Sequence, residues 1–209
     1  MNQFRKQQSR SRLQQNSELD AEYQLDHKGP LRLLLIKLRV HVINTVISLL
    51  PDDFISGTHL RPSILRYFLG MNIGKDTSIW GGSRFQGNNV EIGARCFVNR
   101  NCYFEGTARV VIGDDVEIGH GVTIITTIHE IGDTNRRSGE ASAKAVIIES
   151  GCWVGANVTI LPGVTIGKGV VVGAGSVVTR NTPDNVLIVG VPAKILRELP
   201  AASVPLEME

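Results

Sequence analysis

The stretch CWVGANVTILPGVTIGKGVVVGAGSVVT, residues 152–179, repeats one pattern every six residues. Apolar residues stand at Val154, Ile160, Ile166, Val172 and Val178, and a small or β-branched residue follows four positions after each. A period of six matches neither the 3.6 residues of a helical turn nor the alternation of an ordinary strand. It is typical of a β-helix, in which each hexapeptide supplies one flat face and a turn.

Outward from this stretch, the same pattern covers residues 73–190, apart from one break. Three hexapeptides make a coil of 18 residues, and five such coils begin at residues 73, 92, 112, 148 and 166. One coil alone cannot bury its apolar side, so the coils must stack. We therefore predict an all-β chain that forms a parallel β-helix of about five coils. The apolar leading residues of the fifteen hexapeptides are Ile73, Ile79, Phe85, Ile92, Val98, Phe104, Ile112, Ile118, Ile124, Ile148, Val154, Ile160, Ile166, Val172 and Val178.

The three cysteines fall inside this pattern. Cys96, Cys102 and Cys152 each stand four residues after a leading position, in a column that faces inward. Buried thiols behave as small apolar groups. We expect all three to be structural and none to be a nucleophile or a metal ligand.

The segments on either side of the coils have other compositions. Residues 1–28 are polar, and we expect a flexible N-terminus there. Residues 29–72 are predicted to be helical, with helices over 30–50 and 61–70, because Pro30 suits a first turn and Pro51 and Gly70 suit helix ends. For residues 191–209 we expect a short C-terminal helix and a tail.

The apolar stretch LRLLLIKLRVHVINTVISLLP, residues 31–51, contains Arg32, Lys37, Arg39 and His41, which makes it a poor membrane span. Two interpretations remain open. The helix docks on the main domain, or it lies in the surface of an anionic membrane, to which leucines and cations together are suited.

The length and net charge of the chain limit the classes of protein that it can belong to. The chain has 209 residues, of which 42% are hydrophobic, and a net charge of +2. This is enough for one buried core, and the small net charge does not indicate a nucleic-acid partner. The first residues have no apolar core of a signal peptide, and the cysteine number is odd. We expect a cytoplasmic protein.

The repeat breaks once, directly after His129. Residues 130–147 would place Glu130, Arg136 and Ser142 at leading positions, so they cannot form a sixth coil. A polar loop of this size in a compact domain is often functional. We expect His129 to face outward where the loop departs, whereas His120 faces outward with no loop beside it.

Three motifs, IGDDVEIGHGVTI, the stretch quoted above and VLIVGVPAKILREL, resemble the hexapeptide-repeat acyltransferases. The resemblance covers residues 73 to about 199. It is strongest to the galactoside, maltose and nodulation-factor O-acetyltransferases and to related polysaccharide and xenobiotic enzymes. It implies a left-handed parallel β-helix, a homotrimer, and acetyl-CoA lying between neighbouring subunits, with no metal required.

The resemblance also assigns residues by position. It implies that His129 is the general base and that Asn99 helps to bind the acceptor. The implied contacts with acetyl-CoA are Trp153, Ala156, Ala174, Thr179, Arg180, Lys194 and Arg197. An acidic residue of the sugar-acetylating branch falls on Thr107 here, and the helical segment of that branch is not found in residues 1–72.

These residue types suit the implied reaction, because a neutral imidazole can take a proton from an acceptor hydroxyl near neutral pH. Simpler roles also remain open. Trp153 would fill a corner of the coils, Lys194 and Arg197 would form a solvated face, and Asn99 would be a left-handed turn residue.

Several functions fit the sequence. The first is an acetyl-CoA-dependent O-acetyltransferase that acts on a saccharide hydroxyl, in exopolysaccharide or cell-surface glycan synthesis. The alternative within enzymes is a xenobiotic O-acetyltransferase that acts on an antibiotic. Two further alternatives are a gamma-class carbonic anhydrase-like metalloenzyme and a non-catalytic scaffold. The metalloenzyme would need a third histidine in addition to His120 and His129. The expected partners are a second and third copy of the chain, a saccharide, and a membrane surface contacted peripherally through residues 31–50.

Overall fold

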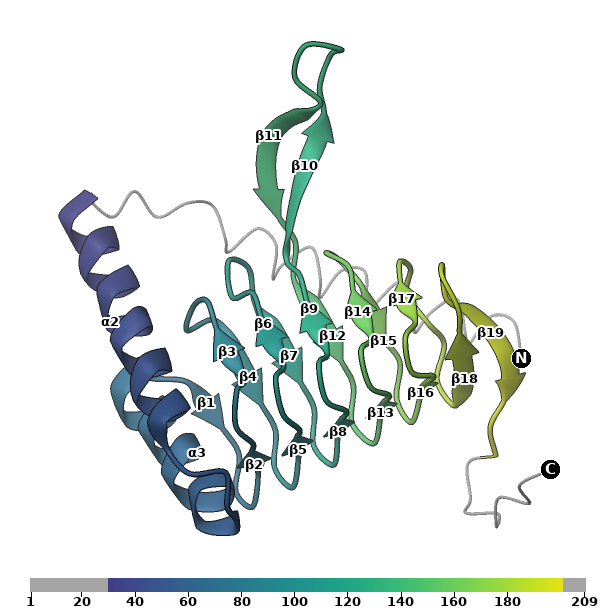
Figure 1. The fold of residues 1–209 in the computed structure, drawn as a ribbon. Helices are drawn as coiled ribbons and strands as arrows, with labels where there is room; N and C mark the ends of the chain where they lie inside the picture. The colour runs from purple at the N-terminus through teal and green to yellow at the C-terminus, as the bar shows by residue number, and fades with distance from the viewer. Residues whose placement is uncertain (1–29, 201–209) are drawn as a thin grey trace.

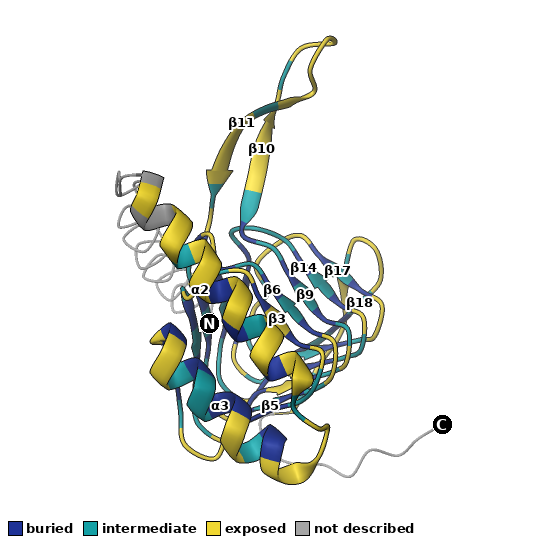
Figure 2. Cartoon of the chain, turned by 60° about the vertical axis from the view of Figure 1, so that its left-hand side comes forward, coloured by how far each residue is buried: buried dark blue, intermediate teal, exposed yellow. Residues whose placement is uncertain are grey.

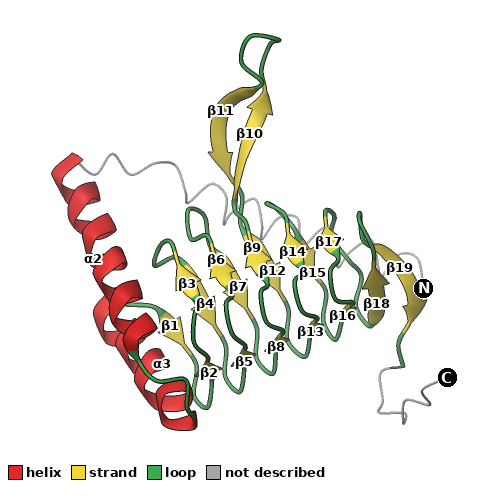
Figure 3. Cartoon of the chain, viewed as in Figure 1, coloured by secondary structure: helices red, strands yellow, loops and turns green. Residues whose placement is uncertain are grey.

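The computed structural model describes residues 30–200, except for the side chains of Pro30, Arg32 and Leu33. Its strands wind into a three-sided prism with helices at one end (Figures 1 and 3). Sheet 1 contains β1 (Asn72–Ile73), β4 (Val90–Ile92), β7 (Val110–Ile112), β12 (Val146–Ile148) and β15 (Thr165–Ile166). Sheet 2 contains β2 (Ser78–Ile79), β5 (Phe97–Val98), β8 (Glu117–Ile118), β13 (Trp153–Val154), β16 (Val171–Val172), β18 (Val186–Val189) and β19 (Lys194–Glu198). Sheet 3 contains β3 (Arg84–Phe85), β6 (Tyr103–Phe104), β9 (Thr123–Ile124), β14 (Thr159–Ile160) and β17 (Val177–Val178).

The prism confirms the predicted β-helix. All fifteen leading residues are buried, and successive coils pair in parallel with matching positions, such as Ile112 opposite Ile148. The coils beginning at 73, 92, 112, 148 and 166 are complete, and β18 begins one further face. The rings of Phe85 and Phe104 stack with centroids 4.9 Å apart. The core is therefore one continuous column of side chains along the prism axis.

The cysteines lie in this column, as predicted. Cys96, Cys102 and Cys152 are buried and unpaired. Burial raises the pKa of Cys102 and Cys152 to about 11, which keeps both thiols protonated at neutral pH.

A helical cap, residues 30–69, covers the first coil. Its helices are α2 (Pro30–Leu49), the π-helix η1 (Ser56–Leu60), α3 (Arg61–Ile64) and the π-helix η2 (Leu65–Leu69). The predicted helix over 30–50 is confirmed, and the second helical region begins earlier than expected and ends at Gly70, which has φ +69°. Val40, Ile43 and Ile47 of α2 join the buried core. Asn44 of α2 accepts from the N–H of Phe85 (3.0 Å) and donates to its carbonyl (2.7 Å), so the helix is docked on the coils.

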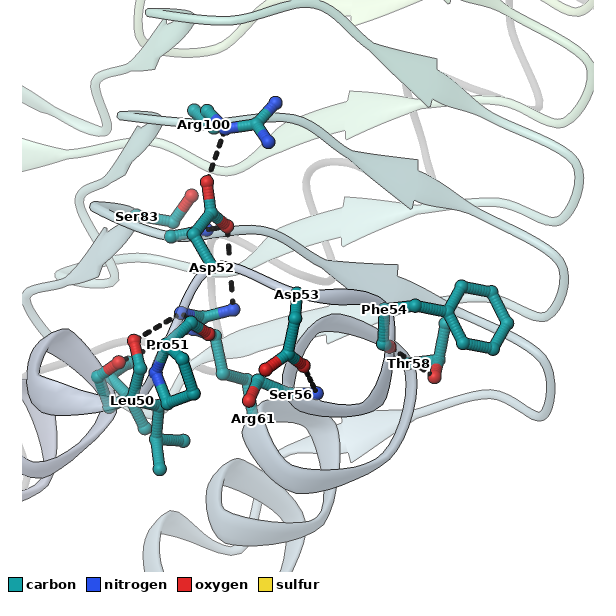
Figure 4. A network of polar contacts seen from close by, with 12 residues as sticks. Leu50, Pro51, Asp52, Asp53, Phe54, Ser56, Thr58, Arg61, Ser83 and Arg100 are labelled. Carbon is teal, nitrogen blue, oxygen red and sulfur yellow. Dashed lines mark hydrogen bonds and ion pairs between the residues drawn. The ribbon is translucent and has the colours of Figure 1, made fainter.

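A buried arginine joins the cap to the second coil (Figure 4). Arg61 has 2% of its surface exposed, and it donates to the carbonyls of Leu50 and Pro51 at 2.9 and 3.0 Å. It lies 3.8 Å from Asp52, which also pairs with Arg100 of the coils. Asp52 accepts from the N–H of Gly81 at 3.1 Å. The chain between α2 and η1 is therefore tied to the prism by charge-assisted hydrogen bonds.

The break in the repeat is an ordered β-hairpin, hereafter called the arm. It consists of β10 (Thr127–Ile131) and β11 (Ser138–Ala143), paired antiparallel, and it stands out from the coils (Figure 1). The expected loop over 130–147 is thus shifted, because the chain leaves the prism at Thr127 and Val146 already belongs to β12. Glu130, Arg136 and Ser142 are exposed, in agreement with the exclusion of a sixth coil.

The predicted C-terminal helix is wrong. Residues Lys194–Glu198 form β19, which folds back and pairs antiparallel with β18. Beyond β18 the prism has no further coil, so the backbone groups on that edge would lack partners, and β19 satisfies them. The expected flexible N-terminus, residues 1–28, and the tail from 201 lie outside the described residues. Among the helices of residues 30–200, none is long and apolar enough to cross a membrane.

Candidate functional site

Most of the predicted site residues fall on two of the three edges of the prism, and the others lie on sheet 2. Asn99, Ala156 and Ala174 follow strands of sheet 2 and lie on the edge between sheets 2 and 3, here called the second edge. Thr179 and Arg180 follow β17 and are exposed on the edge between sheets 3 and 1, here called the third edge. The arm that carries His129 leaves from this third edge as well. Sheet 3 therefore separates the two groups within one chain.

His129 lies on the arm rather than at the corner where we expected it. It is the third residue of β10, exposed, and placed opposite Ala141 of β11. Its Nδ1 lies 3.2 Å from the carbonyl oxygen of Gly139. A carbonyl only accepts, so Nδ1 carries the proton in the neutral ring and Nε2 keeps a free lone pair. This arrangement leaves Nε2 able to accept a proton from a hydroxyl.

One column of the second edge, at Gly119, Gly155 and Gly173, is bare backbone. A Cβ at Gly119 would lie 2.6 Å from the nitrogen of Ala156, and a Cβ at Gly155 would lie 2.6 Å from the nitrogen of Ala174. Only glycine fits at such positions, and this allows successive turns to stack closely. Asn99 occupies the column that holds glycine in the next three coils. A long thin ligand could lie close to the backbone along this edge.

Asn99 is not the left-handed turn residue that the alternative interpretation required. Asn101 takes that conformation, with φ 59°, and Asn99 does not have a positive φ. The side-chain oxygen of Asn99 accepts from the N–H of Arg100 at 2.8 Å. Within residues 30–200 its side-chain nitrogen has no hydrogen-bond partner. Asn99 can therefore donate to a bound molecule.

Trp153 stands on the outer surface of sheet 2, with 53% of its surface exposed. It therefore does not fill a corner of the core. Through the sheet register, Trp153 aligns with Val171, Val171 with Leu187, and Leu187 with Arg197 of β19. Three steps between neighbouring strands, at about 4.8 Å each, separate Trp153 from Arg197 by roughly 14 Å.

Lys194 pairs with Val189, and Arg197 pairs with Leu187. These two partners are two residues apart on β18, so they face the same side of the strand. The register of β19 shifts between them, which keeps both cations on the outer side although they are three residues apart. Lys194 and Arg197 thus lie on the same outer surface as Trp153. The C-terminal helix predicted from the sequence would not have revealed this shared surface. Both are exposed.

One residue of the third edge was missed by the sequence analysis. Glu105, which follows β6, lies below the point where the arm departs and accepts hydrogen bonds from Thr126 and Thr127. Partial burial alone would raise the pKa of Glu105, but these hydrogen bonds outweigh it and hold the pKa below its ordinary value. The sequence signal that could have identified Glu105 is a carboxylate one coil before the break, at the level of the two threonines that begin the arm.

Other features of the surface lie away from these residues. A groove on sheet 1 and its edge with sheet 2, lined by Glu91, Asp114 and Ser150 among others, contains none of the predicted site residues. Across residues 30–200, no three His, Cys, Asp or Glu side chains gather in a group suited to a metal ion. His120 lies on the second edge, whereas His129 is on the arm of the third.

The fold and the two edges define a class of protein, the β-helical acyltransferases. The family model for the bacterial transferase hexapeptide (six repeats) matches residues 145–180. Among solved structures, a maltose O-acetyltransferase from Clostridium difficile superposes with a TM-score of 0.72 at 32% identity, covering 80% of this chain and 88% of that one. The chain belongs to the hexapeptide-repeat acetyltransferases, and its prism is their left-handed parallel β-helix.

Two further relatives show what this family includes. A hexapeptide-repeat-containing acetyltransferase from Vibrio cholerae, solved in complex with acetyl-CoA, has a TM-score of 0.70 at 30% identity and covers 80% of this chain and 88% of that one. The galactoside O-acetyltransferase of Escherichia coli is 40% identical over 113 residues, which are 54% of this chain and 56% of the relative. The chain spans about half the length of the curated relatives it matches.

Proposed function

We propose that this protein is an acetyl-CoA-dependent O-acetyltransferase that acylates a hydroxyl of a saccharide, with His129 as general base. The observation that carries the proposal is the imidazole on the arm, whose Nδ1 is tied to the Gly139 carbonyl and whose Nε2 is free. The family membership and the acetyl-CoA complex of the Vibrio cholerae relative support the choice of donor. The names of the maltose and galactoside relatives support a saccharide acceptor, and we propose that this saccharide belongs to exopolysaccharide or cell-surface glycan synthesis.

The proposed reaction is a direct transfer. Nε2 of His129 takes the proton of the acceptor hydroxyl, and the oxygen attacks the thioester carbonyl carbon. Backbone N–H groups stabilise the oxyanion of the tetrahedral intermediate. The C–S bond then breaks, the imidazolium returns its proton to the sulfur, and an acetyl ester and CoA are released. Because burial raises the pKa of Cys96, Cys102 and Cys152, no thiolate is at hand to form an acyl-enzyme.

The outer surface of sheet 2 fits acetyl-CoA. Trp153 offers an exposed apolar ring for the pantetheine arm, and Lys194 and Arg197 offer positive charge for the phosphates roughly 14 Å further along the sheet. The bare backbone at Ala156 and Ala174 borders this surface along the second edge. We place Thr179 and Arg180 on the cofactor as well, but from a different chain, because they lie on the third edge.

This division of residues is why we propose a homotrimer. Within one chain, His129 and Asn99 stand on different edges, and sheet 3 separates them. A neighbouring copy whose arm reaches across to the second edge would bring a base beside an acceptor-binding asparagine. Three copies related by a threefold axis form three equivalent sites of this kind.

We also propose that α2 contacts a membrane surface. Its exposed apolar residues recur at spacings of three and four, so at about 100° per residue they form a stripe roughly 120° wide, opposite Val40, Ile43 and Ile47. Figure 2 shows the outward side of α2 as exposed. Arg39 borders one side of the stripe, and Lys37 and His41 border the other, whereas α2 contains no Asp or Glu. This charge favours anionic lipid headgroups. The residues of the stripe are Leu31, Leu34, Leu35, Leu38, Val42, Val46 and Leu49.

The test of the transferase is the release of free CoA thiol. Purified protein is mixed with acetyl-CoA and a panel of mono- and oligosaccharides, together with chloramphenicol and a streptogramin, beside His129→Ala. We expect turnover that depends on a saccharide and falls at least a hundredfold in the variant, while CoA binding stays intact. Equal turnover of both proteins would remove His129 as the base.

The acceptor panel and three simple measurements on the same protein separate the alternative functions. Turnover with the antibiotics and none with the saccharides would favour the xenobiotic enzyme. Absence of acetyl-CoA binding would favour a scaffold. Stoichiometric zinc in the purified protein, with carbon dioxide hydration, would favour the carbonic anhydrase-like enzyme.

A further inference from the structure

The point where the arm leaves the coils creates a hydrogen-bonding problem. Inside the prism, backbone N–H groups pair with carbonyls of the neighbouring coils, as Ile125 does with Ile160 of the next coil at 3.0 Å and Gly121 does with Arg100 of the preceding coil at 2.9 Å. From Thr126 onward the chain departs, so the N–H groups of Thr126 and Thr127 lose these partners. Backbone donors without a partner destabilise a fold when they are withdrawn from water, as Thr126 is, with none of its surface exposed.

Glu105 solves this problem from the preceding coil. Its Oε2 accepts from the N–H of Thr126 and from the N–H of Thr127, both at 2.8 Å. Its Oε1 accepts from the Thr127 hydroxyl at 2.8 Å. One carboxylate therefore holds the first two residues of the arm by three charge-assisted hydrogen bonds.

The second leg of the arm is tied to the same point. Thr126 donates its hydroxyl to the carbonyl of Glu105 at 3.0 Å, and the hydroxyl accepts from the N–H of Ala108 at 3.2 Å. The carbonyl of Thr126 accepts from the N–H of Lys144 at 2.8 Å, where β11 returns to the prism. Both legs of the hairpin thus meet at a base that is anchored to the coil of Glu105.

This base also determines where His129 points. Thr127 and His129 are two residues apart on β10, so their side chains leave the same face of the strand. The Thr127 side chain is bound to Glu105, which sets the orientation of that face. Within residues 30–200, the only further contact that holds the ring is with Gly139, which belongs to the arm itself and moves with it.

We propose that Glu105 is a positioning residue for His129, which fixes the arm relative to the coils and so places Nε2 for proton transfer. This inference rests on the proposed role of His129. A displacement of about 1 Å in a reacting group can cost on the order of a hundredfold in rate. Loss of the Glu105 anchor should therefore appear in kcat and not in the affinity for acetyl-CoA.

The test compares three variants in the thiol-release assay. Glu105→Ala should lower kcat about 10- to 100-fold and leave the KM for acetyl-CoA within about threefold. Glu105→Gln keeps one oxygen that can accept both N–H groups and an amide that can donate to Thr127, so it should recover to within about threefold of the wild type. Glu91→Ala is the matched control, since Glu91 is also a half-buried carboxylate, paired with Arg109 at 2.6 Å, and it makes no hydrogen bond to residues 126–144.

Amide hydrogen exchange supplies a second readout that does not depend on turnover. Residues 127–143 should exchange faster in Glu105→Ala than in the wild type or in Glu91→Ala, with the coils unchanged. Wild-type kcat and wild-type exchange in Glu105→Ala would overturn the inference, as would equal losses in Glu105→Ala and Glu91→Ala. If His129→Ala keeps its turnover, the base assignment is what fails, and the exchange rates still decide whether Glu105 holds the arm.

Discussion

The coils and the arm are built in opposite ways from similar residues. In the coils, isoleucines such as Ile118 are fully enclosed by the coils above and below. In the arm, Ile131 has 87% of its surface exposed, and no residue of β10 or β11 is buried. The arm is held by its own backbone pairing and by the anchor at its base. The comparison teaches that stability resides in the stack, whereas the arm is free to serve another molecule.

The largest expected difference in stability comes from placing the same charge once in the coils and once on the arm. Ile118→Asp puts a carboxylate in the dry core and should lower the free energy of unfolding by more than about 4 kcal/mol, or prevent folding. Ile131→Asp makes the same change on the arm and should alter it by less than about 0.5 kcal/mol. Urea denaturation at one fixed protein concentration measures both. A large loss in Ile131→Asp would mean that Ile131 itself is buried against the neighbouring copy that the arm reaches in the proposed trimer.

The next effect contrasts the cap with the surface of the coils. Arg61→Met leaves the carbonyls of Ile47, Leu50 and Pro51 without their charged donor, the first of them buried, and should cost about 2–4 kcal/mol of unfolding free energy. Arg95→Met breaks the exposed Arg95–Asp115 pair and should cost much less, because water screens a pair on the surface. Thermal and urea unfolding compare the two variants. Similar losses would show that the buried network of Figure 4 contributes no more than a surface pair.

The smallest expected effect concerns the exposed stripe of α2. Wild-type protein should float with vesicles that contain phosphatidylglycerol and much less with pure phosphatidylcholine. The double change Leu34→Glu and Leu38→Glu should reduce flotation about tenfold, because it places charge in the apolar layer. Ile195→Glu with Leu196→Glu, exposed apolar residues of β19 at the other end of the prism, is the control and should float normally.

Two results would contradict the membrane proposal. Flotation that is unchanged in the α2 variant would do so. A second contradicting result has two parts. The wild type does not bind vesicles, and light scattering shows that the α2 variant has a different oligomeric state. The stripe would then join copies of the chain.

Much of the fold could be predicted because its rule is local. A leading residue such as Ile118 must face inward whatever the rest of the chain does. A cysteine four positions after a leading residue, as Cys152 is after Ile148, must face inward too. The pattern also showed that the repeat breaks near His129, although the chain leaves the prism earlier, at Thr127. The C-terminal strand was not, because VPAKILREL has no period of its own and pairs with β18 only to complete an open sheet edge.

The site required the stack as well. Trp153 and Arg197 are 44 residues apart in the sequence, and the sheet register alone places them in one outward column. Likewise, Glu105 is 24 residues before His129, and its role follows from lying one coil below the arm. Neither relation leaves a periodic signal.

The sequence by itself determined the β-helix, the buried thiols and the existence of one interruption near His129, because the hexapeptide pattern decides burial residue by residue. The tertiary structure alone decided which exposed side chains share a face and which lie on separate edges. It also decided which tautomer of His129 the Gly139 carbonyl favours. The physical reason is that hydrogen bonds and electrostatic contacts between coils depend on register, which is a property of the stacked chain.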